Sequence, residues 1–88
     1  MAYQVEYLPT VIADDIPALP KTMRERIRKA IGERLTVSPV ELGKPLRYSW
    51  RGHFRLRVGD WRVIYRVNPE TKTVTIVKIM NRKDAYED

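Results

Sequence analysis

The stretch RLRVGDWRVIYR, residues 55–66, decides the fold. Apolar and basic residues alternate on both sides of Gly59 and Asp60, and a period of two residues is typical of half-buried strands. A two-residue turn with glycine in its first position is typical of a type II′ hairpin. The sequence therefore predicts an antiparallel hairpin with strands at residues 54–58 and 61–67.

The predicted turn fixes the register of the hairpin and therefore its two faces. One face is apolar and is expected to pack in the core, with Phe54 opposite Tyr65, Leu56 opposite Val63, and Val58 opposite Trp61. The other face is basic, with Arg57 opposite Arg62, Arg55 opposite Ile64, and His53 opposite Arg66. The arginines of this face are expected to be exposed together.

Like charges that lie directly opposite one another across two strands destabilise a sheet. The only acidic residue of the hairpin, Asp60, lies in the turn. The arginines are either separately solvated or arranged to bind an anion, and we favour the second interpretation. A planar guanidinium binds phosphate through two parallel hydrogen bonds, and a strand holds it more rigidly than a loop does.

The rest of the chain is predicted to supply three further strands and two helices. The strands are expected at residues 1–7, 46–50 and 73–80, and the helices at residues 10–16 and 20–35. Pro17 limits the first helix, because its ring clashes with the preceding turn. Residues 36–45 read as a loop, and residues 81–88 as a polar tail with at most one helical turn. We expect residues 1–88 to form a single α+β domain, strand–helix–helix followed by an antiparallel sheet, with the helices packed on one face.

The composition favours a globular protein with an anionic partner. The net charge is +6, from 17 Lys and Arg against 11 Asp and Glu. The chain has no cysteine, which excludes disulfides and thiolate metal sites and fits a cytoplasmic location. No apolar run approaches the length of a membrane span, so no membrane contact is expected. The basic side of the 20–35 helix is interpreted as a solvated face, with a second nucleic-acid surface as the alternative.

Two further residues are candidates for proton transfer. His53, the only histidine, is either a general acid or base or a turn residue without chemistry. Tyr86 is either an edge anchor or a functional phenol beside the arginines, where positive charge favours the phenolate. The adjacent carboxylates Asp14 and Asp15 point to different sides of a helix, and no metal or other cofactor is expected.

Several segments together resemble the RelE family of toxins, within the RelE/ParE superfamily. They are AYQVEY, DDIPALPKTMRERIRKAI, SPVELGKPL, GHFRLRVGDWRVIYRV and NRKDAYED, and the fourth is the longest and most specific. The resemblance implies a ribosome-dependent mRNA interferase that cuts mRNA in the A site without a metal. In that reaction the 2′-hydroxyl attacks the adjacent phosphodiester and leaves a 2′,3′-cyclic phosphate and a 5′-hydroxyl.

The resemblance also implies roles for individual residues and partners. Arg55 and Arg57 match two basic strand residues of the family, and Arg62 matches an arginine that follows an aromatic residue. In the tail, Arg82 and Tyr86 match the family's arginine and terminal tyrosine, which completes the expected catalytic set. The expected RNA contacts are His53, Arg66 and Lys83. The expected partners are a RelB-like antitoxin, the 16S rRNA of the ribosomal A site, and mRNA.

The chain departs from the family pattern at three places. Some relatives have lysines at the positions of Arg55 and Arg57, and many have histidine at the position of Asn81. Pro17 interrupts a helix that is often continuous in the family. Two other functions stay open: a ParE-like inhibitor of DNA gyrase without nuclease activity, and a basic RNA-binding domain without toxicity. The combination of RLRVGDWRVIYR with Tyr86 favours the nuclease.

Overall fold

A five-stranded sheet forms the centre of the protein, as the computed structural model shows for residues 2–83. The strand order is β1-β5-β4-β3-β2. The strands are β1 (Gln4–Tyr7), β2 (Lys44–Pro45), β3 (Phe54–Val58), β4 (Trp61–Asn68) and β5 (Thr73–Asn81). Strand β1 runs parallel to β5, and the other neighbours are antiparallel. The predicted α+β class is confirmed.

The central hairpin of β3 and β4 has the predicted register. Arg57 pairs with Arg62, and Val58 pairs with Trp61 on either side of the turn. Gly59 has a φ of 59°, as the first position of a type II′ turn requires. The predicted pairing of His53 with Arg66 is wrong, because the ladder ends one residue earlier. The carbonyl of His53 instead accepts a hydrogen bond from the N–H of Leu46, 3.0 Å away, on the side of β2.

The helical segments lie between strands, most of them between β1 and β2. Helix α1 (Lys21–Ala30) continues directly into η2 (Ile31–Leu35), which matches the helix predicted at residues 20–35. The predicted short helix is η1 (Val11–Asp15), and α2 (Pro39–Leu42) forms a single turn within the predicted loop. In the part of the chain that the structure describes, no helix is both long and apolar enough to cross a membrane.

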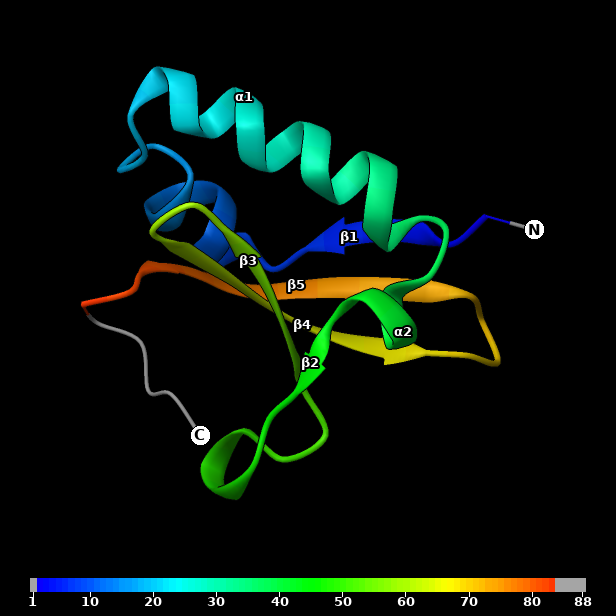
Figure 1. Ribbon diagram of the computed structural model, residues 1–88. Helices are drawn as coiled ribbons and strands as arrows, with labels where there is room; N and C mark the ends of the chain where they lie inside the picture. Colours follow the sequence, from blue (N-terminus) through cyan, green and yellow to red (C-terminus); the bar gives the residue numbers. More distant parts are fainter. Residues whose placement is uncertain (1, 84–88) are drawn as a thin grey trace.

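The strand predicted at residues 46–50 is wrong. This segment contains the short helix η3 (Tyr48–Trp50), and the edge strand β2 lies earlier in the chain. Tyr48 has a φ of 55°, which lies outside the range of a strand. The N–H groups of Trp50 and Arg51 bond to the carbonyls of Arg47 and Tyr48 instead of to a neighbouring strand. In Figure 1 this turn extends away from α1.

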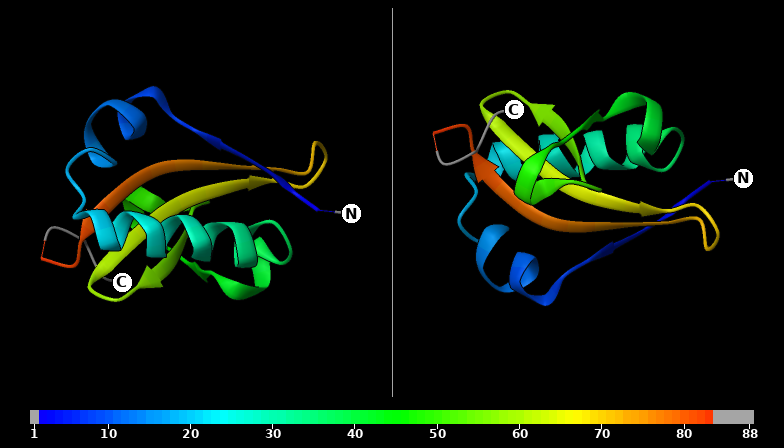
Figure 2. Two further views of the ribbon diagram at one scale, coloured as in Figure 1. Left: turned by 90° about the horizontal axis from the view of Figure 1, so that it is seen from above. Right: turned by 90° about the horizontal axis from the view of Figure 1, so that it is seen from below.

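The main core lies between the helices and one face of the sheet. Figure 1 shows α1 along this face, and the view from above in Figure 2 shows α1 crossing β3 and β4 with η1 near β5. The core is apolar, and its buried residues include Val11, Ile27, Ile31, Leu35, Leu56, Val58, Val63, Tyr65, Val74, Ile76 and Ile79. The predicted apolar face of the hairpin is confirmed, with Phe54 and Trp61 only partly buried.

A buried tyrosine connects the sheet to the segment that leads into β2. The hydroxyl of Tyr65 donates a hydrogen bond to the carbonyl of Pro39, 2.5 Å away. Burial raises the pKa of Tyr65 to about 12, so this phenol keeps its proton in the pH range above 10, where an exposed tyrosine ionises. Gly43 lies so close that an added Cβ would clash with the hydroxyl oxygen of Tyr65. The absence of a side chain at Gly43 therefore allows the chain to pass into β2 beside β3.

Candidate functional site

The face of the sheet opposite α1 carries the predicted cluster of arginines. Arg55 and Arg57 come from β3, and Arg62 comes from β4 directly opposite Arg57. Arg82 follows β5, and its backbone N–H donates a hydrogen bond of 2.7 Å to the carbonyl of Asp60 in the hairpin turn. This contact fixes the end of β5 at the turn, and the positive charge of Arg82 acts on Arg62 and lowers its pKa, so Arg82 belongs with the others. We call Arg55, Arg57, Arg62 and Arg82 the arginine cluster.

Arg62 lies at the centre of the cluster and is buried. The expectation that it is exposed is wrong, because only 4% of its surface is accessible. Its Nη1 lies 3.4 Å from the carbonyl oxygen of Gly59 and 3.3 Å from that of Trp61, so the side chain folds back toward the turn. Among the described residues it is the only charged one in the buried class.

The environment of Arg62 disfavours its positive charge. Burial lowers the pKa of Arg62, and the positive charges of Arg57, Arg55 and Arg82 lower it further. Asp60 opposes this change but does not reverse it. Arginine nevertheless keeps its proton at neutral pH, so the protein holds a concentrated positive charge in place before any ligand arrives.

Arg57 connects the cluster to the basic side of the helix. It is exposed at the end of β3, beyond the two residues that pair with β2. It lines a hollow of about 380 Å³ together with Arg26, Lys29 and Arg34. No sequence pattern predicts this contact between distant segments, although the basic residues of the helix are evident from the sequence. The positive surface therefore extends from the open face of the sheet around the hairpin to the helix.

The other predicted basic residues lie outside the cluster. Arg66 is exposed and faces Thr75. It lies four residues beyond Arg62 on β4, which places it about 13 Å away along the strand. Lys83 is exposed, and its backbone N–H donates to the side-chain oxygen of Asn81, 3.1 Å away. Tyr86 lies outside the residues that the structure describes.

His53 contacts an aromatic residue that sequence reasoning did not select. Its imidazole lies nearly perpendicular to the Trp50 ring, with 5.4 Å between the ring centroids. Its Nδ1 is buried and has no hydrogen-bond partner within residues 2–83. The sequence did not mark Trp50 as a site residue, because this segment was predicted to be a strand and the turn that presents Trp50 was not predicted.

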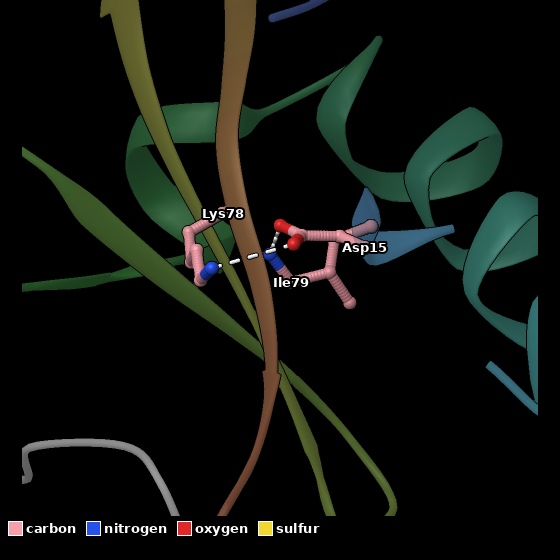
Figure 3. A network of polar contacts seen from close by, with 3 residues as sticks. All are labelled: Asp15, Lys78 and Ile79. Atoms are coloured by element: carbon pink, nitrogen blue, oxygen red, sulfur yellow. Dashed lines mark hydrogen bonds and ion pairs between the residues drawn. The ribbon is translucent and has the colours of Figure 1, made fainter. Parts of the chain in front are cut away.

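The paired carboxylates of η1 have a structural contact. The Asp15 carboxylate lies 3.3 Å from the ammonium of Lys78 and accepts a hydrogen bond of 2.9 Å from the backbone N–H of Ile79. Figure 3 shows these three residues and their contacts. Asp15 therefore ties η1 to β5 beyond the end of β1. Over the described range, no group of three or more His, Asp or Glu side chains is placed to hold a metal ion.

The chain is similar to known toxins over nearly its full length. The family described as "ParE toxin of type II toxin-antitoxin system, parDE" matches residues 5–86. Toxin RelG of Mycobacterium tuberculosis is 34% identical over 86 residues, which cover 98% of each chain.

Solved structures give the same picture. The toxin–antitoxin complex RelBE2 of Mycobacterium tuberculosis contains a chain with a TM-score of 0.85 and 30% identity, and the match covers 93% of this chain and 100% of that one. The archaeal RelE–RelB complex from Pyrococcus horikoshii gives a TM-score of 0.73 at 29% identity, over 97% of this chain and 100% of the other. The similarity therefore extends over nearly the whole chain and includes the hairpin that carries the arginines.

Proposed function

This chain belongs to the RelE-type toxins of the RelE/ParE superfamily of type II toxin–antitoxin systems, and on that premise we propose that it is an endoribonuclease that cleaves mRNA in the ribosomal A site. The observation that supports the proposal most strongly is the arginine cluster. Three of its members lie on adjacent strands, and the fourth is fixed beside the hairpin turn. Such a cluster has little use in a protein without an anionic ligand, since its charges repel one another.

The proposed reaction is attack of the mRNA 2′-hydroxyl on the adjacent phosphodiester. The O2′–P bond forms and the P–O5′ bond breaks, which leaves a 2′,3′-cyclic phosphate and a 5′-hydroxyl. Negative charge accumulates on the phosphate oxygens in the transition state, where preorganised guanidiniums stabilise it. One such contact is commonly worth a factor of about 10² to 10³ in rate.

The guanidiniums are poorly suited to move the protons of this reaction, because arginine hardly deprotonates. We assign that role to Tyr86, which the family resemblance implies, because a phenol beside positive charge is more readily deprotonated than a guanidinium. The same ring also offers a stacking surface for a base. Arg55, Arg57, Arg62 and Arg82 bind and stabilise the phosphate in this assignment. His53, Arg66 and Lys83 are placed as outer RNA contacts, with smaller effects on the rate.

The proposed partners follow from the charge of the cluster and from the solved relatives. Two of those relatives are complexes of a Rel toxin with its antitoxin. We extend this to a RelB-like antitoxin for the present chain, with acidic side chains that neutralise the arginine cluster. The substrate complex is a translating ribosome with mRNA in the A site, which places the protein in the cytoplasm.

The matching family is named after ParE, which keeps a gyrase inhibitor as the second candidate. A protein that acts by binding alone needs no group of guanidiniums preorganised around one position. The two candidates predict different lesions in the cell. The nuclease leaves cut mRNA, whereas the gyrase inhibitor leaves damaged DNA and stalled replication.

Inducible expression followed by primer extension on translated mRNAs tests the proposal. We expect cuts that follow the codon frame, and a loss of about 10² to 10³ in rate for Arg57→Ala and Arg82→Ala. Arg66→Ala is the matched control, because it removes an arginine from the same sheet face outside the cluster, and we expect less than a tenfold loss. Intact mRNA with stalled replication would support the gyrase inhibitor, and growth without any defect would support a non-toxic RNA-binding domain.

A further inference from the structure

A hollow of about 510 Å³ lies at the end of β5, next to the arginine cluster. It contains both tryptophans of the chain. Its lining includes Trp50, Trp61, Met80, Lys78, Asp14 and Asp15. Trp50 comes from η3 and the two acidic residues from η1, so segments far apart in the sequence meet here. We call it the tryptophan hollow.

The tryptophan hollow and the arginine cluster share the same strand ends. Met80 is the β5 partner of Arg62, and Asn81, which also lines the hollow, is the partner of Trp61. Partners across antiparallel strands have Cα atoms about 4.5–5.5 Å apart. Arg82 follows Asn81 directly. A ligand whose phosphate lies on the cluster therefore has its neighbouring groups beside the hollow.

The chemistry of the hollow differs from that of the cluster. Indole rings and a thioether supply a flat, polarizable and largely apolar surface, which suits the face of a nucleobase. The carboxylates of Asp14 and Asp15 repel phosphate and therefore direct the backbone of a nucleic acid to the arginines. Asp15 is engaged by Lys78 and Ile79, whereas Asp14 is exposed and can accept hydrogen bonds from the amino group of a base.

Trp50 is the better candidate for the stacking surface. Trp61 is partly buried against the main core, so its ring also has a structural role. Trp50 lies on a turn whose first residue, Tyr48, has a left-handed backbone that is unfavourable for a residue with a side chain. The imidazole of His53 lies nearly perpendicular to Trp50 and helps to fix its orientation.

We propose that the tryptophan hollow holds a nucleobase next to the phosphate on the arginine cluster, and that Trp50 is the surface on which this base stacks. The inference rests on the proposed function, which makes RNA the ligand of the cluster. Trp50 is then a determinant of which codon is cut. Stacking on an aromatic side chain typically changes affinity by about ten- to a hundredfold.

The two tryptophans make the proposal directly measurable, because they are the only ones in the chain. Trp61→Phe leaves Trp50 as the single tryptophan, and Trp50→Phe leaves Trp61. Each variant is titrated with a short RNA that carries 2′-deoxyribose at the cleavage position, so that it cannot be cut. A matched oligonucleotide lacks the base at that position and keeps every phosphate.

We expect the intact oligonucleotide to quench the emission of Trp50 with saturation, and the abasic one to leave it unchanged. Trp50→Ala should weaken binding of the intact oligonucleotide about ten- to a hundredfold without affecting the abasic one. Arg57→Ala should weaken both, because it removes a phosphate contact. Binding without quenching of Trp50, or binding by Trp50→Ala as tight as by the unaltered protein, would overturn the proposal.

Primer extension in cells is a second test of the stacking role of Trp50, and it does not depend on the affinity of the isolated protein for RNA. We expect Trp50→Ala to cut translated mRNA at an altered set of codons and Trp50→Phe to keep the original set. If a folded Trp50→Ala variant cuts at the same codons as the unaltered protein, Trp50 has no stacking role, whereas the proposed nuclease activity still stands. If RNA quenches Trp50 but mRNA stays intact in cells, the stacking role stands and the proposed nuclease activity falls, because the hollow then binds a base without cleavage.

Discussion

Replacing Arg57 by glutamine is expected to stabilise the folded protein while it impairs activity. Arg57 lies directly opposite Arg62 across the hairpin, and the positive charge of Arg57 lowers the pKa of Arg62. Glutamine keeps a polar side chain of similar reach and removes the charge. Because Arg57 is exposed, the substitution leaves no cavity in the core.

The size of the effect follows from the charges that surround Arg57. Two unit charges about 5 Å apart in water repel by about 1 kcal/mol, and partial shielding from water increases this value. Arg26, Lys29 and Arg34 line the same hollow as Arg57 and add to the repulsion, whereas Glu33 reduces it. We therefore expect a gain of about 1 kcal/mol in the free energy of unfolding at low salt. For a domain of this size, such a gain raises Tm by about 4–8 °C.

Urea denaturation of the two proteins at low salt and in about 1 M NaCl tests the calculation, because a Debye length of about 3 Å screens the pair at the higher concentration. The gain should largely disappear there. Arg66→Gln is the control, since Arg66 faces Thr75 rather than another arginine, and its effect should stay within about 0.5 kcal/mol. A loss of stability in Arg57→Gln, or a gain that persists at high salt, would refute the electrostatic reasoning.

Three further predictions concern the structural contacts that hold the site. Gly43→Ala should destabilise the protein by about 1–3 kcal/mol in thermal denaturation, because the new Cβ meets the hydroxyl of Tyr65, and adding Tyr65→Phe should reduce this cost. Asp15→Ala should cost about 1–3 kcal/mol in urea denaturation, because the N–H of Ile79 loses its acceptor, whereas Lys78→Ala should cost less than about 1 kcal/mol as an exposed partner. Since the pKa of Tyr65 rises from 10.0 to about 12 on folding, the folded state keeps a proton that the unfolded chain releases between these pH values. The free energy of unfolding should therefore fall as pH rises from about 10 to 12, and that of the Tyr65→Phe variant should fall less steeply over the same range.

The hairpin was predictable because its information is local. Gly59 and Asp60 define the turn, and the turn defines which arginines share a face. The same local reasoning failed for Tyr48, because its left-handed backbone replaces a strand that its β-favouring neighbours suggest. The burial of Arg62 was also not predictable, since it depends on contacts of its guanidinium with the turn carbonyls rather than on alternation.

The long-range contacts of the site have no pattern in the sequence. Arg82 reaches the cluster because its backbone bonds to Asp60, and Arg57 reaches the basic helix because β2 ends before it. Trp50 and Asp14 line one hollow although they lie far apart in the sequence. Such contacts follow from the packing of η1 and η3 around the end of β5, which only the folded chain reveals.

The distribution of stability over the molecule explains how the cluster is tolerated. The helices cover one face of the sheet and form the main core there, while the mutually repelling arginines lie on the other face. The core therefore keeps the cluster in place at a cost that an anion offsets when it binds. In the proposed function, RNA and an acidic antitoxin segment both supply that negative charge, and the same guanidiniums cannot serve both at once. Neutralisation by the antitoxin is then competition for the arginine cluster, and it requires no change in the fold of the toxin.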